Sequence, residues 1–203
     1  MCAMRLKSHW FKADKPKTMK QMAGAMAFIT WRVTDNALKQ LRTAKFDIDA
    51  GSQYFAFTGE FLVFLIQIAD RIAHERLEPQ QRVEFTTELV IRLSEILEEN
   101  EDRLLGPAGK ESYRSRFIDL FNELSDHYAE FKYVDNNPDF AFVRYLGSRV
   151  TELMVAKDRT WVMDQIMAIE APDAIKFLQQ SMTDLFHTGP RERSKRPARA
   201  SGD

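Results

Sequence analysis

The sequence predicts an all-α protein, an antiparallel helical bundle of about seven helices in a single domain. Three observations lead to this prediction. Apolar residues recur every three to four positions over most of the chain, which is the spacing of one face of an α-helix. The 203 residues include only 8 glycines and 7 prolines, fewer than the many tight turns of an all-β protein would need. We also find no pair of strand-like segments joined by a two-residue turn.

The first predicted helix runs from about Thr18 to Ala44, and Thr18 has the hydroxyl side chain that suits an N-cap. Its apolar stripe consists of Met19, Met22, Met26, Ile29, Val33, Ala37 and Leu41. A second apolar flank, formed by Phe28, Trp31 and Leu38, lies outside this stripe. Such a flank indicates either burial between two layers of the same chain or a contact with a second chain, and from it we predict a homodimer.

The second predicted helix runs from about Ser52 to Leu77 and is apolar on nearly every side, which indicates a central place in the bundle. Its polar side chains fall within a sector of about 60°, at 100° per residue. We call this set the polar line: Glu60, Gln67, Arg71 and His74. It is either the polar wall of a ligand pocket or the exposed edge of a mostly buried helix, and we favour the exposed edge.

Five further helices follow from the same periodicity. They cover about residues 79–102, 111–133, 138–154, 158–169 and 172–186. The Gly-Pro-Ala-Gly sequence at 106–109 interrupts the pattern, and Pro172 opens the seventh helix because proline is tolerated in a first turn. Gly147 and Ser148 are small enough to let another helix approach the fifth closely.

Charge is distributed unevenly along the chain, although the net charge is only -1. Residues 1–20 carry +5 and residues 187–203 carry +3, so residues 21–186 carry -9. We therefore divide the chain into a basic N-terminal arm (1–17), a helical domain (18–186) and a disordered basic tail (187–203). An acidic body makes nucleic acid an unlikely partner, except through the basic tails.

Cysteine content and hydropathy predict a cytoplasmic protein. Cys2 is the single cysteine, so no intramolecular disulfide can form, and a reducing compartment is expected. No secretory signal is recognised at the N-terminus. The longest apolar stretch, Phe61 to Ile66, is far shorter than the ~18 residues that span a bilayer, so we expect no transmembrane segment.

A metal site is the alternative hypothesis for function. Asp70 and His74 are four residues apart on the second predicted helix, and Glu123 and His127 are four apart on the fourth. Residues at this spacing face the same way, so each pair offers one oxygen and one imidazole nitrogen to a shared metal, with Glu60 as a further carboxylate. Chance produces such pairs often, and the competing interpretation is two helix-surface pairs.

No motif in the sequence dictates a chemistry. A phosphate-binding Gly-x-x-x-x-Gly-Lys-Ser/Thr loop, a Gly-x-Ser-x-Gly elbow and a zinc-protease His-Glu-x-x-His are all missing. Our favoured hypothesis is a non-enzymatic protein that binds a protein partner or a small ligand. The alternative is a metal- or cofactor-dependent helical-bundle enzyme with its site near His74 and His127. The sequence leaves the catalytic residues and the identity of any cofactor open.

Overall fold

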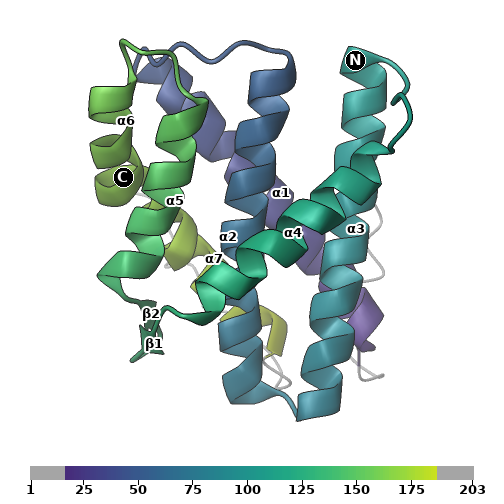
Figure 1. Ribbon diagram of the computed structural model, residues 1–203. Coiled ribbons are helices and arrows are strands. Elements are labelled where there is room, and N and C mark those ends of the chain that lie inside the picture. The colour runs from purple at the N-terminus through teal and green to yellow at the C-terminus, as the bar shows by residue number, and fades with distance from the viewer. Residues whose placement is uncertain (1–16, 187–203) are drawn as a thin grey trace, which may run out of the picture.

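A computed structural model describes residues 17–186, and most of them are helical (Figure 1). In chain order the elements are α1 (Met19–Thr43), α2 (Ser52–Arg76), α3 (Pro79–Leu105), α4 (Tyr113–Ala129), β1 (Tyr133–Val134), β2 (Asn137–Pro138), α5 (Phe140–Leu153), α6 (Arg159–Gln165), the π-helical turn η2 (Ile166–Glu170) and α7 (Ala171–Phe186). The all-α class is confirmed. The predicted arm and tail lie outside the described residues, apart from Lys17.

The helix count differs slightly from the prediction. The sixth and seventh predicted helices form one continuous helical segment, α6–η2–α7, so residues 17–186 contain six separate helices. Pro172 has no backbone N–H and would interrupt an ordinary α-helix at this point. The preceding turn widens instead, and the Ala171 N–H bonds the Ile166 carbonyl in the π pattern. The chain thereby passes the proline without a break.

The second helix is central, as predicted. Residues 57–69 of α2 are buried without interruption, and Phe61, Leu65 and Ile68 have no exposed surface. Helices α1, α3, α4, α5 and α7 all pack against α2. In Figure 1, α4 runs diagonally across α2, and α3 lies beside α2. Within residues 17–186, no helix has the combined length and apolar character that crossing a membrane requires.

A small β-hairpin between α4 and α5 corrects the expectation that no strands pair. Tyr133 pairs with Pro138 and Val134 with Asn137, in antiparallel register. The two residues between the strands, Asp135 and Asn136, have φ values of 52° and 59°. Asp and Asn tolerate this left-handed conformation better than most residues, and it is the one that a tight hairpin turn needs. The sequence did not predict these strands, because each is only two residues long and shows no alternation of apolar and polar residues.

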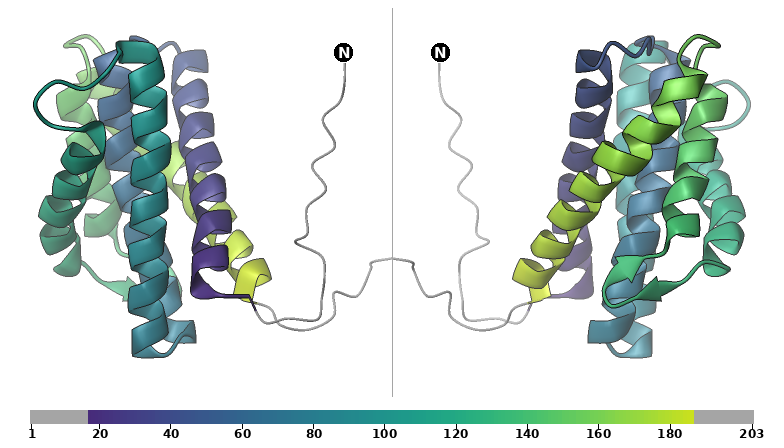
Figure 2. Two further views of the ribbon diagram at one scale, coloured as in Figure 1. Left: turned by 90° about the vertical axis from the view of Figure 1, so that its right-hand side faces the viewer. Right: turned by 90° about the vertical axis from the view of Figure 1, so that its left-hand side faces the viewer.

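Helix α5 packs closely against the α6–η2 segment, which leads directly into α7. Gly147 lies at this contact, where an added Cβ atom would be 3.3 Å from Cγ of Met163 and 3.4 Å from Cγ of Met167. The predicted close approach at Gly147 is therefore confirmed. Helix α7 then slants back across α1 (Figure 2).

Candidate functional site: the groove between α1 and α7

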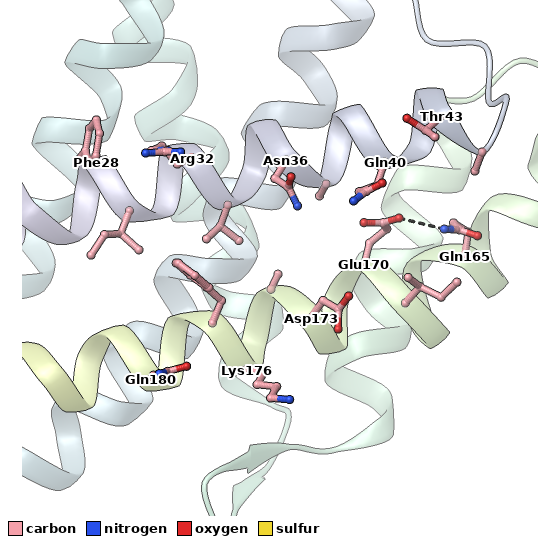
Figure 3. A pocket seen from close by; sticks show the side chains of 17 residues that line it. Phe28, Arg32, Asn36, Gln40, Thr43, Gln165, Glu170, Asp173, Lys176 and Gln180 are labelled. Atoms are coloured by element: carbon pink, nitrogen blue, oxygen red, sulfur yellow. Dashed lines mark hydrogen bonds between the residues drawn. The ribbon is translucent and has the colours of Figure 1, made fainter. Parts of the chain in front are cut away.

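A groove of about 920 Å³ lies between α1 and the α6–η2–α7 segment (Figure 3). Its α1 side extends from Phe28 to Ala44, and its other side extends from Gln165 to Gln180. The two helices run in opposite directions in Figure 3, so the η2 end of the groove faces the C-terminal half of α1. The small side chains of Ala37 and Ala174 line it, which leaves space between the two helices.

Much of the groove wall is apolar. Ile29 and Val33 belong to the apolar stripe predicted for the first helix, and here they line the groove. Three larger side chains that line it remain open to solvent: Phe28 is 60% exposed, Phe177 55% and Ile169 47%. Exposed apolar side chains that gather at one concave surface are typical of a binding site.

Glu170 is the buried charged group of this groove. Only 4% of its surface is exposed, and Nε2 of Gln165 donates a hydrogen bond to its Oε1 at 2.9 Å. In Figure 3 the carboxyl group points from its helix toward α1. Burial raises the pKa of Glu170 above its ordinary value, and the negative charge of Asp173 raises it further. Among residues 17–186, no basic side chain lies within ion-pairing distance of Glu170.

Two basic residues line the groove, but at its rim. Arg32 and Lys176 are both exposed. The Arg32 guanidinium lies over the Phe28 ring, 5.7 Å from the ring centroid. In Figure 3, Arg32 lies on the side of α1 away from α7, and Lys176 lies on the side of α7 away from α1. Both lining cations are therefore exposed, with Arg32 on the same side of α1 as Phe28, whereas the carboxyl group of Glu170 is buried.

The polar line of α2 is neither a pocket wall nor an exposed edge along most of its length. Glu60 is 4% exposed, and Nε of Arg149, on α5, lies 3.0 Å from its Oε1. Nε2 of Gln67 donates to Oγ of Ser125 at 2.7 Å. Arg71 donates to the backbone carbonyl of Tyr128, at 3.2 Å. These contacts, which we call the polar seam, join α2 to α4 and α5.

The first pair of the metal hypothesis is held by an arginine of α3. Arg82 binds both carboxylate oxygens of Asp70, and its Nε–Oδ1 distance is 2.9 Å. Thr86 donates a third hydrogen bond to Asp70, at 2.8 Å. Nη1 of Arg82 also lies 3.2 Å from Nδ1 of His74. Asp70 and His74 thus form one cluster with α3, and His74 is otherwise exposed.

The second pair lies on a different side of the bundle. Glu123 and His127 are exposed on α4, and the His127 ring contacts Tyr145 of α5 at a centroid distance of 5.6 Å. Glu60, the proposed fifth ligand, is occupied by Arg149. Within residues 17–186, no group of three or more His, Cys, Asp or Glu side chains is placed to hold a metal ion. The metal site at these residues stays a prediction, and each of its carboxylates on α2 has an arginine partner.

The flank from which we predicted a homodimer is divided by the fold. Leu38 is 1% exposed and belongs to the core, whereas Trp31 is partly buried against it. Phe28 remains exposed and lines the groove. The homodimer stays a prediction. Of the three residues on which it was based, Phe28 is the one that is largely exposed to solvent.

Sequence reasoning missed Glu170 because Pro172 was interpreted as the start of a new helix. When residues 159–186 are taken as one helix, Ile166, Glu170 and Ala174 fall at four-residue intervals on its buried face. A single acidic residue within an otherwise apolar stripe was thus the available signal. The widened turn that places Glu170 beside Gln165 has no comparable sequence signature.

The site as a whole is a concave surface that apolar and polar side chains line in similar numbers. Small-molecule sites combine apolar surface with polar groups that fix the orientation of the ligand. Its volume of about 920 Å³ is within the usual range for such sites. Comparisons of the chain with models of known protein families, with curated proteins and with solved structures find no match.

Proposed function

We propose that this protein is a non-enzymatic binding protein and that the groove between α1 and α7 takes a small ligand with an apolar body. The observation that carries the proposal is the coincidence of three exposed apolar side chains and one buried carboxyl group at the same concave surface. Leaving Phe28, Ile169 and Phe177 in water is unfavourable, and a ligand that covers them gains about 25 cal/mol for each Å² of apolar surface removed from water.

A small ligand fits the groove better than a protein partner does. At one end of the groove, the buried Glu170 accepts a hydrogen bond from Gln165. Stable protein interfaces bury roughly 800 Å² on each partner, usually on a flatter surface. The absence of a disulfide-forming pair of cysteines supports a cytoplasmic setting for this activity.

Binding of the neutral apolar fluorophore N-phenyl-1-naphthylamine tests the proposal. We expect the purified full chain to bind the probe with a rise in fluorescence. Phe177→Asp places a charge on the apolar wall and should weaken probe binding at least about tenfold, since desolvating an unpaired charge costs more than the roughly 1.4 kcal/mol that corresponds to this factor.

Phe140→Asp is the matched control. Phe140 is 71% exposed at the start of α5 and does not line the groove, so probe binding should be unchanged. Equal loss in both variants, or no binding by the parent protein, would contradict the proposal. Metal analysis of the same preparation checks the alternative, because one equivalent of a transition metal would favour an enzyme at His74 and His127.

A further inference from the structure

We infer that the ligand of the groove carries a protonated amine, which pairs with Glu170 while its apolar body lies along Phe177. This inference rests on the proposed function and names the chemical class of the ligand. Its basis is the pairing of the buried carboxylates. Glu60 has Arg149 as its partner, whereas no basic side chain of residues 17–186 forms an ion pair with Glu101 or Glu170. Of these two unpaired carboxyl groups, only Glu170 lines the groove.

A buried carboxylate without a cation is costly, so such a group either takes up a proton or receives a cation from outside. Gln165 supplies one hydrogen bond but no charge. Asp173, one turn further along the same helix, adds a second negative charge to this end of the groove. An ammonium group bound here would balance the charge of Glu170 and gain from that of Asp173.

An anionic head group fits the same place poorly. It would meet the carboxylates of Glu170 and Asp173 at the η2 end, and the two cations of the groove, Arg32 and Lys176, are exposed at the rim. In Figure 3 both basic side chains lie away from the space that Glu170 faces. A neutral head group would supply no positive charge, so Glu170 would then be neutralised only by taking up a proton.

The spacing along the helix sets the size of the apolar body. Phe177 follows Glu170 by seven residues, which corresponds to about 10 Å at 1.5 Å per residue. An octyl chain roughly matches this length. Octylammonium, 1-octanol and octanoate therefore present the same body with a cationic, a neutral and an anionic head group.

Displacement of N-phenyl-1-naphthylamine by these three compounds, at concentrations below micelle formation, tests the inference. We expect octylammonium to displace the probe at a concentration at least about tenfold lower than 1-octanol or octanoate does. Glu170→Gln should remove this preference, because breaking one side of a buried charge pair typically costs tenfold or more in affinity. Asp173→Asn should reduce the preference less, since Asp173 is exposed.

Asp164→Asn is the control, because Asp164 is an exposed carboxylate of α6 that does not line the groove. It should leave the preference unchanged. Equal displacement by all three compounds, preference for octanoate, or a preference that survives Glu170→Gln would each overturn the amine while the groove remains a binding site. If the probe does not bind the parent protein at all, the proposed function fails together with the inference.

Discussion

Glu60 and Glu170 are equally buried, each with 4% of its surface exposed, but only Glu60 has a cation as its partner among residues 17–186. Glu60 belongs to the polar seam, where α2 meets α4 and α5. Every side chain named in that seam finds a group of opposite charge or a hydrogen-bonding partner on another helix. Glu170 belongs to the groove between α1 and α7, where its one hydrogen bond comes from a neutral amide of a neighbouring turn.

The presence or absence of a cation partner distinguishes two roles of a buried carboxylate, one in packing and one in binding. A carboxylate that is matched within the chain fixes how helices pack, and removing its partner leaves a charge stranded in a low-dielectric interior. A carboxylate that is left unmatched beside an open groove weakens the fold slightly and is available to a ligand. The comparison therefore predicts stability changes of opposite sign in the two regions.

The largest effect is expected at the polar seam. Arg149→Met keeps much of the side-chain volume but leaves Glu60 buried without a cation. We expect the free energy of unfolding to fall by about 3–5 kcal/mol, as measured by urea denaturation at pH 7. The double variant Glu60→Gln/Arg149→Met removes the stranded charge and should recover more than half of the loss.

Arg144→Met is the control for this experiment. Arg144 lies on the same helix and is exposed, so its replacement should change stability by no more than about 0.5 kcal/mol. A small effect of Arg149→Met, similar to that of Arg144→Met, would mean that Glu60 reaches water and that the two regions do not differ in the way we describe.

Glu101 sharpens the comparison because it is a buried carboxyl group that does not line the groove. It is 9% exposed on α3, and burial raises its pKa from 4.5 to about 7, although the charge of Arg116 lowers it. We expect Glu101→Gln to stabilise the protein by about 1–2 kcal/mol at pH 8, a value discounted for partial contact with solvent. Urea denaturation of the parent and the variant measures the difference.

The sign of this effect depends on pH. Because the folded state holds the Glu101 proton more tightly than the unfolded state, the parent protein loses stability as the pH rises from about 4.5 to about 7. The two proteins should therefore differ little at pH 4 and most above pH 7. Glu101→Gln should not change the preference for octylammonium, since Glu101 lies outside the groove. If Glu101→Gln did change that preference, then a buried carboxyl group outside the groove would influence it, and the preference could not be assigned to the position of Glu170 in the groove.

Local patterns in the sequence were sufficient to predict the helices, but not to predict which polar groups of different helices pair with one another. The apolar surface all round α2 predicted its central place, and Thr18 caps α1 through a hydrogen bond from the Gln21 N–H, as its side chain suggested. These features depend on residues within a few turns of one another. By contrast, Glu60 and Arg149 are 89 positions apart, and no periodicity indicates that they meet.

The candidate site was missed for a related reason. A groove is the space left between α1 and α7, so it depends on the angle and separation at which two distant helices pack. Ile29 and Val33 have the same spacing whether a helix covers them or a groove does. For the first pair of the metal hypothesis, the sequence correctly predicted that Asp70 and His74 lie on one face of α2. It did not predict that the cation beside them is Arg82 of α3.

The smallest effect, and the one that decides between the two roles of a carboxylate, is expected for Glu170→Gln in the protein without ligand. Glu170 has a raised pKa, so its burial destabilises the fold increasingly as the pH rises above the ordinary value of 4.5. Glutamine removes that charge, and the hydrogen bond from Gln165 can be kept by its carbonyl oxygen. We therefore expect a gain of less than about 1 kcal/mol at pH 7 and almost none at pH 4, again by urea denaturation.

Asp164→Asn should give no such gain at either pH. A loss of stability comparable to that of Arg149→Met would make Glu170 a structural group like Glu60, and its carboxyl would then not be free to pair with an amine.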